Sequence, residues 1–378
     1  MVMEDYTYDR INDEIEIEPE DNNIEDLHGS FDPNAIDVDT SVVNLGSLLE
    51  RLEANEIDLL PELQHTSDVW TSVKKSRLIE SVLLALPLPS FYFSEDTETN
   101  KLLVVDGLQR LSAFSDFCIS KKLKLQGMQF LTELEGVTYD KLDRTHIRRI
   151  KSLKVTVNTL RKNTPLKVKL VLFQRVNAAG VPLTPQEMRN ALYSQKATDL
   201  LRRMAKLDSF GNATGGKIPS KRMTDCDFAN RFVAFYLYGE EYDGNLEEFM
   251  GDALEKVSKM QQQDLDLILK SFDRSMQVCY TLLGDTAFKR PDPQEPNRFL
   301  KTNKALFEVL SVSIAHLTVK EQGILVQRKN RFRSEIYSLC KNEDFIQSIT
   351  LGTANTLQVN CRHTKVKQLI KQVISYDS

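Results

Sequence analysis

The sequence of 378 residues lacks any apolar run of the ~18–20 residues that a membrane-spanning helix needs. Its acidic N-terminus also lacks the basic and apolar segments of a signal peptide. We therefore expect a cytoplasmic protein that does not bind membranes. The five cysteines are widely spread and form no C-x-x-C pair, so the sequence predicts neither a disulfide framework nor a zinc site.

Motifs of several enzyme classes are absent too. The five histidines lie far apart, and no G-x-S-x-G string occurs. The sequence therefore gives no support to a serine hydrolase or to a metal-dependent nuclease. Residues 211–217 match the spacing of a P-loop, but Ile218 replaces the hydroxyl residue and Pro219 disfavours the helix that should follow. We interpret this string as a basic loop.

The net charge of -5 conceals an uneven distribution. Residues 1–40 contain 14 Asp and Glu against one Arg, which leaves a net +8 for the other 338 residues. The segment 1–40 has too few large apolar residues to offset the entropy of ordering, so we predict an acidic, disordered tail. Such a tail either keeps the chain in solution or imitates nucleic acid and covers the basic body.

Hydrophobic periodicity divides the remaining chain into two domains. Residues 41–208 mix helical and strand patterns, with a strand, tight turn and helix over 102–119. A Gly-, Ser- and Lys-rich stretch at 209–222 is predicted to be a linker loop. From 223 to 378 nearly every segment has helical spacing. The predicted fold class is α+β, a mixed α/β domain followed by an all-α domain.

The strand-to-helix turn at Val104–Leu111 is the motif that best fits chemistry. Free N–H groups at a helix start attract anions, and Gly107 permits close backbone approach. Arg110 offers a planar fork for phosphate oxygens, Asp106 suits Mg²⁺, and Gln109 can orient water. A structural alternative is that Asp106-x-x-Gln109 forms a capping box and that Arg110 lies on the surface.

Two other polar segments have similarly open interpretations. Arg175 and Asn177 either complete a polar pocket or belong to a helix C-terminal cap that ends at Gly180. The basic residues between Arg144 and Lys154 either contact nucleic acid or form a solvated helix face.

An ordered series of strings, spread over about residues 42–195, resembles the D-G-Q-Q-R family. This family forms the N-terminal domain of GmrSD-type (type IV) restriction enzymes and is similar in fold to ParB and sulfiredoxin. The strings are Val69-Trp70, Lys75-Ser76, 78–84 (LIESVLL), 86–89 (LPLP), 105–110 (VDGLQR), 173–177 (FQRVN) and 180–190 (GVPLTPQEMRN).

The resemblance implies binding of a nucleoside triphosphate with Mg²⁺, with or without hydrolysis, in bacterial defence against foreign DNA. By position it implies catalytic roles for Asp106, Gln109 and Arg110, with Asp106 as the metal ligand. The same correspondence gives nucleotide-binding residues and two weaker candidates, Gln186 and Arg189. The nucleotide-binding residues are Gly107, Arg110, Arg175, Asn177, Gln64 and Lys75.

The sequence departs from the family pattern in three ways, of which the first, at Leu108, is expected to be harmless because Leu108 should face the core. Leu108 replaces the first Gln of the motif, and His65 stands where the family has an Arg, which weakens a phosphate site at neutral pH. The family's C-terminal His-Asn-His nuclease domain has no counterpart in the sequence. We therefore expect DNA cleavage to need a partner effector protein. The alternative function is a non-catalytic module that binds DNA or protein, and a homo-oligomer remains an open expectation.

Overall fold

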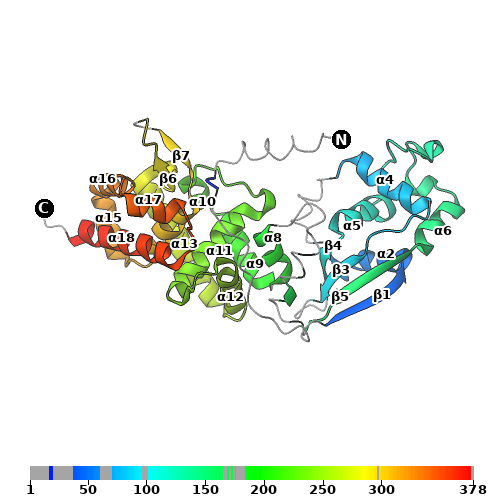
Figure 1. Ribbon diagram of the computed structural model, residues 1–378, viewed down its shortest axis with the longest axis horizontal. Helices are drawn as coiled ribbons and strands as arrows, with labels where there is room; N and C mark the ends of the chain where they lie inside the picture. The colour runs from blue at the N-terminus through cyan, green and yellow to red at the C-terminus, as the bar shows by residue number, and fades with distance from the viewer. Residues whose placement is uncertain are drawn as a thin grey trace. The chain divides into compact units, whose positions relative to one another are not determined.

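The computed structural model describes residues 17–19, 37–59, 70–95, 101–162, 164, 168–169, 172, 175, 184–193, 195–295 and 298–375. Helices and strands carry the labels of Figure 1. The chain divides into two compact units, Gly29–Leu192 and a second one made of Met1–His28 and Tyr193–Ser378. Each unit is described by itself.

A five-stranded mixed sheet organises the unit Gly29–Leu192. Its strands lie in the order β1-β5-β3-β4-β2, with β5 parallel to β3, β2 parallel to β4, and antiparallel pairing for β1–β5 and β3–β4. Strand β2 pairs with the first two residues of β4, and β3 pairs with β4 as far as Asp106, so this pairing positions the residue that ends β4. The strands are β1 Val38–Asn44, β2 Ile57–Asp58, β3 Phe91–Glu95, β4 Leu102–Asp106 and β5 Lys154–Leu160.

Four helices gather beside one face of this sheet (Figure 1). Their apolar residues recur at helical spacing, as in α2, where Leu45, Leu48, Leu49 and Leu52 are all buried. These residues share one hydrophobic core with Phe91 and Phe93 of the sheet. The helices are α2 Leu45–Glu53, α4 Ser72–Leu83, α5 Leu108–Phe114 and α6 Arg144–Ser152, and a fifth, α8 Pro185–Leu192, packs against β4.

Helices make up most of the second unit. Its centre is a group of phenylalanines in edge-to-face contact, with Phe307 packing on Phe228 at 4.9 Å and on Phe288 at 4.8 Å between ring centroids. A hairpin of β6 Lys289–Pro291 and β7 Phe299–Thr302 interrupts the helices. The helices are α9 Gln195–Ala205, α10 Asp208–Ala213, α11 Thr224–Tyr238, α12 Leu246–Ser258, α13 Gln262–Leu283, α14 Lys304–Ala315, α15 Val319–Gln327, α16 Lys329–Leu339, α17 Glu343–Thr350 and α18 Thr356–Ser375.

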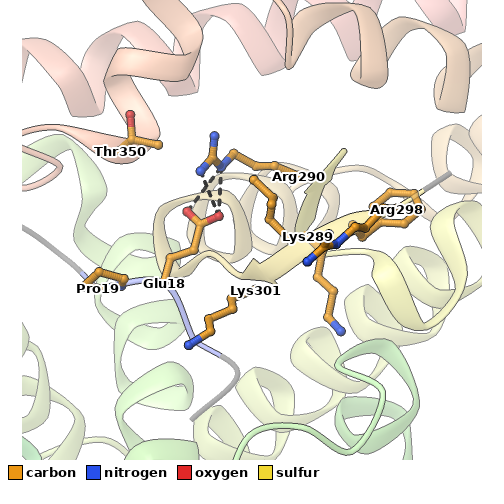
Figure 2. A pocket seen from close by; sticks show the side chains of 9 residues that line it. Glu18, Pro19, Lys289, Arg290, Arg298, Lys301 and Thr350 are labelled. Carbon is orange, nitrogen blue, oxygen red and sulfur yellow. Dashed lines mark hydrogen bonds and ion pairs between the residues drawn. The ribbon is translucent and has the colours of Figure 1, made fainter. Parts of the chain in front are cut away.

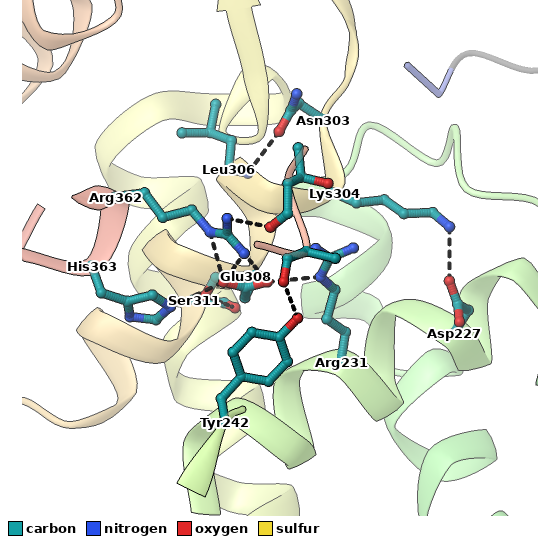
Figure 3. A network of polar contacts seen from close by, with 12 residues as sticks. Asp227, Arg231, Tyr242, Asn303, Lys304, Leu306, Glu308, Ser311, Arg362 and His363 are labelled. Carbon is teal, nitrogen blue, oxygen red and sulfur yellow. Dashed lines mark hydrogen bonds and ion pairs between the residues drawn. The ribbon is translucent and has the colours of Figure 1, made fainter. Parts of the chain in front are cut away.

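A buried ionic cluster crosses the core of this helical unit (Figure 3). Glu308 of α14 accepts hydrogen bonds at 2.8 Å from the Nε atoms of Arg231 of α11 and Arg362 of α18. His363 Nε2 lies 3.0 Å from the same carboxylate. The cluster therefore ties three helices that are far apart in the sequence.

The mixed domain followed by an all-α region confirms the predicted fold class. The boundaries differ from those predicted, however. Strand β1 begins at Val38, inside the predicted tail, and the units divide between Leu192 and Tyr193. The predicted linker 209–222 contains most of α10, where Phe210 is buried, because its apolar side chains pack on α13. Of the predicted tail, only residues 17–19 and 37–40 are among the described residues.

Within the described part of the chain, no single helix combines the length and the apolar composition needed to cross a bilayer. The helices α14 and α15 reach that composition only as a pair, and the pair is bent by 118°.

Candidate functional site

The turn between β4 and α5 forms as the sequence predicts. Strand β4 ends at Asp106, Gly107 has a φ of +104°, and α5 begins at Leu108. A Cβ atom at Gly107 would lie 2.5 Å from Cδ1 of Phe91, so both the left-handed φ and the packing require glycine. The backbone therefore passes directly over the ring of Phe91.

Arg110 lies beneath this turn, and its guanidinium group is engaged on several sides. Its Nη2 donates to Asp106 Oδ2 at 2.7 Å and to the carbonyl oxygen of Ser90 at 3.1 Å, and its Nη1 donates to the carbonyl oxygen of Pro89. The guanidinium carbon lies 4.4 Å from the centroid of the Phe91 ring. Arg110 thereby connects the start of β3 to the end of β4.

These contacts change the interpretation of the motif. The capping box offered as the structural alternative does not form, because the N-cap residue of α5 is Gly107, which has no side chain to cap the helix, and Asp106 instead pairs with Arg110. Arg110 is also buried, not on the surface. Burial lowers the pKa of its guanidinium group, and the charge and hydrogen bond of Asp106 partly offset that effect. Three of the five N–H donors of Arg110 are thus engaged within the fold, which leaves fewer of them for a phosphate.

Asp106 remains accessible at the turn, whereas the side-chain oxygen of Gln109 is buried. The side chain of Asp106 is 33% exposed, and Gln109 is half-buried. A single carboxylate suits Mg²⁺ when phosphate oxygens and water complete the octahedron. Among the described residues there is no group of three or more His, Cys, Asp or Glu side chains that could hold a metal ion. The turn thus offers one accessible carboxylate, that of Asp106.

Lys75 is not at the turn. Its Nζ atom lies 2.7 Å from Asp116 Oδ2 on a π-helical turn, Ser115–Ile119, that continues α5. Asp116 follows Leu108 by eight residues, which corresponds to ~12 Å along a helix axis. The structure thus places Lys75 near the far end of this helical segment, where it pairs with a carboxylate.

Helix α8 brings a second polar group to the same strand. Thr184 and Glu187 form a capping box, with hydrogen bonds of 2.7 and 3.1 Å. Gln186 Oε1 accepts from Arg189 Nε at 2.9 Å, and both residues are buried. Because α8 packs against β4, these two weaker candidates lie beside the strand that ends at Asp106.

For the other predicted site residues the structure gives less information or none. Gln64, His65 and Asn177 lie outside the described residues. Arg175 is exposed and helical. Among the basic residues of α6, Arg144, Arg148, Arg149 and Lys151 are exposed, which fits both expectations for this segment, a solvated face and a contact with nucleic acid.

Sequence reasoning missed Glu80, a buried carboxylate on α4. It accepts hydrogen bonds from the backbone N–H groups of Gln129, Phe130 and Leu131 at 2.7–3.1 Å. Burial alone would raise the pKa of Glu80, but these N–H groups lower it below the ordinary value. The available signal was an acidic residue inside the apolar face of α4.

Comparison with known proteins gives one match. Residues 45–194 match the family model described as the GmrSD restriction endonuclease N-terminal domain. No curated protein and no solved structure matches the chain, so the likeness to ParB and sulfiredoxin stays a prediction. The β4–α5 turn and the whole of α8 fall inside the matched range. The resemblance seen in the sequence motifs is confirmed: residues 45–194 match the N-terminal domain of GmrSD-type restriction endonucleases.

Proposed function

We propose that this protein is a nucleoside-triphosphate-binding regulator of a restriction-type defence system. The observation that carries the proposal is the position of the Asp106–Arg110 turn within the region that matches the GmrSD N-terminal domain. DNA cleavage is assigned to a partner effector, because the sequence carries no His-Asn-His motif.

The residues of the turn support this proposal because each of them would have a different role. Arg110 acts as a positioning residue. Its guanidinium group donates to the carbonyl oxygens of Pro89 and Ser90 and to the carboxylate of Asp106, and so holds that carboxylate in place. Asp106 keeps an accessible carboxylate edge that would hold Mg²⁺ together with phosphate oxygens. Gln109, in the first turn of α5, would orient water. Phosphoryl transfer relies mainly on such positioning and charge stabilisation.

Helix α8 supports the same location from the neighbouring side. Burial of Arg189 requires compensating acceptors, and Gln186 supplies one of them. The two residues belong to the motif series that resembles the family, and α8 packs against β4. We therefore place the base or sugar of the nucleotide toward α8 and its phosphates toward Asp106.

Calorimetric titration with each of the four ribonucleoside triphosphates and Mg²⁺ tests this proposal. The informative variants are Asp106→Asn and Gln109→Ala, because Arg110→Ala would also remove contacts that support the fold. We expect Asp106→Asn to lose Mg²⁺-dependent binding and Gln109→Ala to bind nucleotide but to release phosphate more slowly. The matched control is Glu56→Gln, which neutralises an exposed carboxylate paired with Arg51 in the same unit. Equal binding by Asp106→Asn and the control would refute the site.

A second candidate function, a non-catalytic DNA-binding module, is favoured by the exposed basic face of α6. Binding through phosphates weakens steeply as salt rises, and each lost contact lowers the salt dependence by about one counterion. We expect Arg148→Gln to reduce that slope if α6 contacts DNA. An unchanged slope would remove this candidate.

A further inference from the structure

The β6–β7 hairpin of the helical unit gathers cations around a pocket (Figure 2). Lys289 and Arg290 come from β6, Arg298 precedes β7, and Lys301 lies on β7. Together with Glu18, these residues line a pocket of about 860 Å³. Four cations thus face one lining carboxylate.

That carboxylate comes from the acidic N-terminal segment. Glu18 is bound by the fork of Arg290, with Nε at 3.0 and 3.2 Å from its two oxygens and Nη2 at 2.9 Å. The side-chain amide of Asn303 donates to Glu18 Oε2 at 2.7 Å. The backbone N–H of Glu18 also donates to the carbonyl oxygen of Thr302 at 2.8 Å, which aligns the segment with β7.

The donors that hold Glu18 are fixed by the surrounding fold. Asn303 is buried, its amide also donates to the carbonyl oxygen of Ile349 at 2.7 Å, and its Oδ1 caps α14 by accepting from the N–H of Leu306 at 2.7 Å. The side chain of Arg290 is only 16% exposed. An anion that enters this place therefore meets donors that need little rearrangement.

We propose that this pocket binds the phosphate groups of nucleic acid and that Glu18 is their intramolecular competitor. A guanidinium fork that accepts two carboxylate oxygens presents the same geometry to two phosphate oxygens. Glu18 belongs to residues 1–40, which contain 14 Asp and Glu. The chain therefore carries a polyanionic segment that is covalently attached to it. A tethered competitor acts at a high effective concentration.

Phosphate fits the pocket better than a carboxylate of a partner protein does. A carboxylate fills only the two acceptor positions that Arg290 and Asn303 serve, whereas a phosphate has further oxygens that Lys301 of the lining would bind. Arg298 contributes less, since Glu295 lies at 2.8 Å and Asp292 at 3.7 Å from its guanidinium group. The volume of about 860 Å³ leaves room for a nucleotide beyond the phosphate itself.

This inference goes beyond the proposed function, because the hairpin belongs to the unit that does not contain Asp106. The experiment that tests it requires no nucleotide bound at Asp106. The test uses the full chain and a fluorescein-labelled single-stranded DNA oligonucleotide, read by fluorescence anisotropy. We expect Glu18→Gln to bind about fivefold or more tightly than the wild type, as expected when coupling to a competing ligand is removed. Adding Arg290→Gln to Glu18→Gln should weaken binding about tenfold or more.

Glu241→Gln is the matched control, because it neutralises an exposed carboxylate, paired with Lys256, elsewhere in the same unit. It should leave binding unchanged, and circular dichroism confirms that each variant is folded. Competition with inorganic phosphate distinguishes a site for free phosphate from one that needs the nucleic-acid chain. Equal affinities of the wild type and Glu18→Gln would overturn the proposal, as would tighter binding of Glu18→Gln to a peptide of residues 12–24 than to the oligonucleotide.

Discussion

Each unit of the molecule contains an arginine–carboxylate cluster, and the two clusters are enclosed to different degrees. At the β4–α5 turn, one carboxylate meets one arginine, and the Asp106 side chain is 33% exposed. In the helical unit, Glu308 meets two arginines and a histidine, and the side chains of Glu308 and Arg362 are 0% exposed. The enclosed cluster can only support the fold, whereas the open one leaves a carboxylate edge for a ligand.

The surroundings of the two carboxylates explain this difference. Burial alone would raise the pKa of Glu308, but Arg362, Arg231 and His363 together hold it well below the ordinary value. The charged form is therefore stable only while those partners are present. At the turn, Arg110 donates most of its hydrogen bonds to backbone carbonyl oxygens, so the fold depends more on the arginine than on Asp106.

The largest effect in this comparison should come from Glu308→Gln. Two buried guanidinium groups would lose their counter-charge, and we expect unfolding free energy to fall by about 3–5 kcal/mol. Urea denaturation followed by circular dichroism measures this, because helices dominate that unit. The control Glu241→Gln breaks an exposed pair and should cost less than about 1 kcal/mol. Similar losses of unfolding free energy in both variants would show that the buried cluster stabilises the fold no more than an exposed ion pair does.

Arg110→Lys should have the next largest effect. Lysine keeps the charge but cannot reach Asp106, Pro89 and Ser90 at once, so we expect a loss of about 2–3 kcal/mol in the mixed unit. The sequence contains a single tryptophan, Trp70, and it packs against the core of that unit, so its fluorescence reports unfolding there. Arg51→Lys, in an exposed pair with Glu56, is the matched control. A negligible effect of Arg110→Lys would mean that the fork is free for a ligand.

Glu80→Gln gives a smaller effect that depends on pH. The folded pKa of Glu80 lies below the ordinary value of 4.5, so its stabilisation is complete above that value and is lost as pH falls through the folded pKa. We expect the variant to be less stable by about 1–2 kcal/mol at pH 7 and the difference to shrink in acid. Urea midpoints from pH 7 to pH 3, read by Trp70 fluorescence, measure it. A difference that grows toward pH 3 would contradict the assigned sign.

The turn itself could be predicted because all its determinants are adjacent in the sequence. A buried strand, then Asp106-Gly107, then an apolar helix face is a local pattern, and Gly107 has the positive φ that it indicates. The direction of Arg110 could not be predicted in this way. Its acceptors, Pro89 and Ser90, lie about 20 residues earlier and reach it only through the pairing of β3 with β4.

Elements with weak local patterns were missed for a related reason. Strand β1 has mostly exposed residues and follows an acidic stretch, so only its pairing with β5 identifies it as a strand. Similarly, the proline-rich composition of residues 290–297 is typical of a linker, yet the first two of these residues belong to β6 of the hairpin. Burial of Phe210 in α10 likewise depends on helices that follow it in the chain.

The position of β1 also decides how the mixed unit can be isolated. A chain shortened to begin at Ser41, close to the boundary that composition suggests, would remove three of the seven β1 residues that pair with β5. The N–H and C=O groups left open on β5 would then form an unprotected sheet edge, which invites pairing between separate molecules. Recombinant fragments of this unit should therefore begin before Asp37, or they will be prone to aggregate.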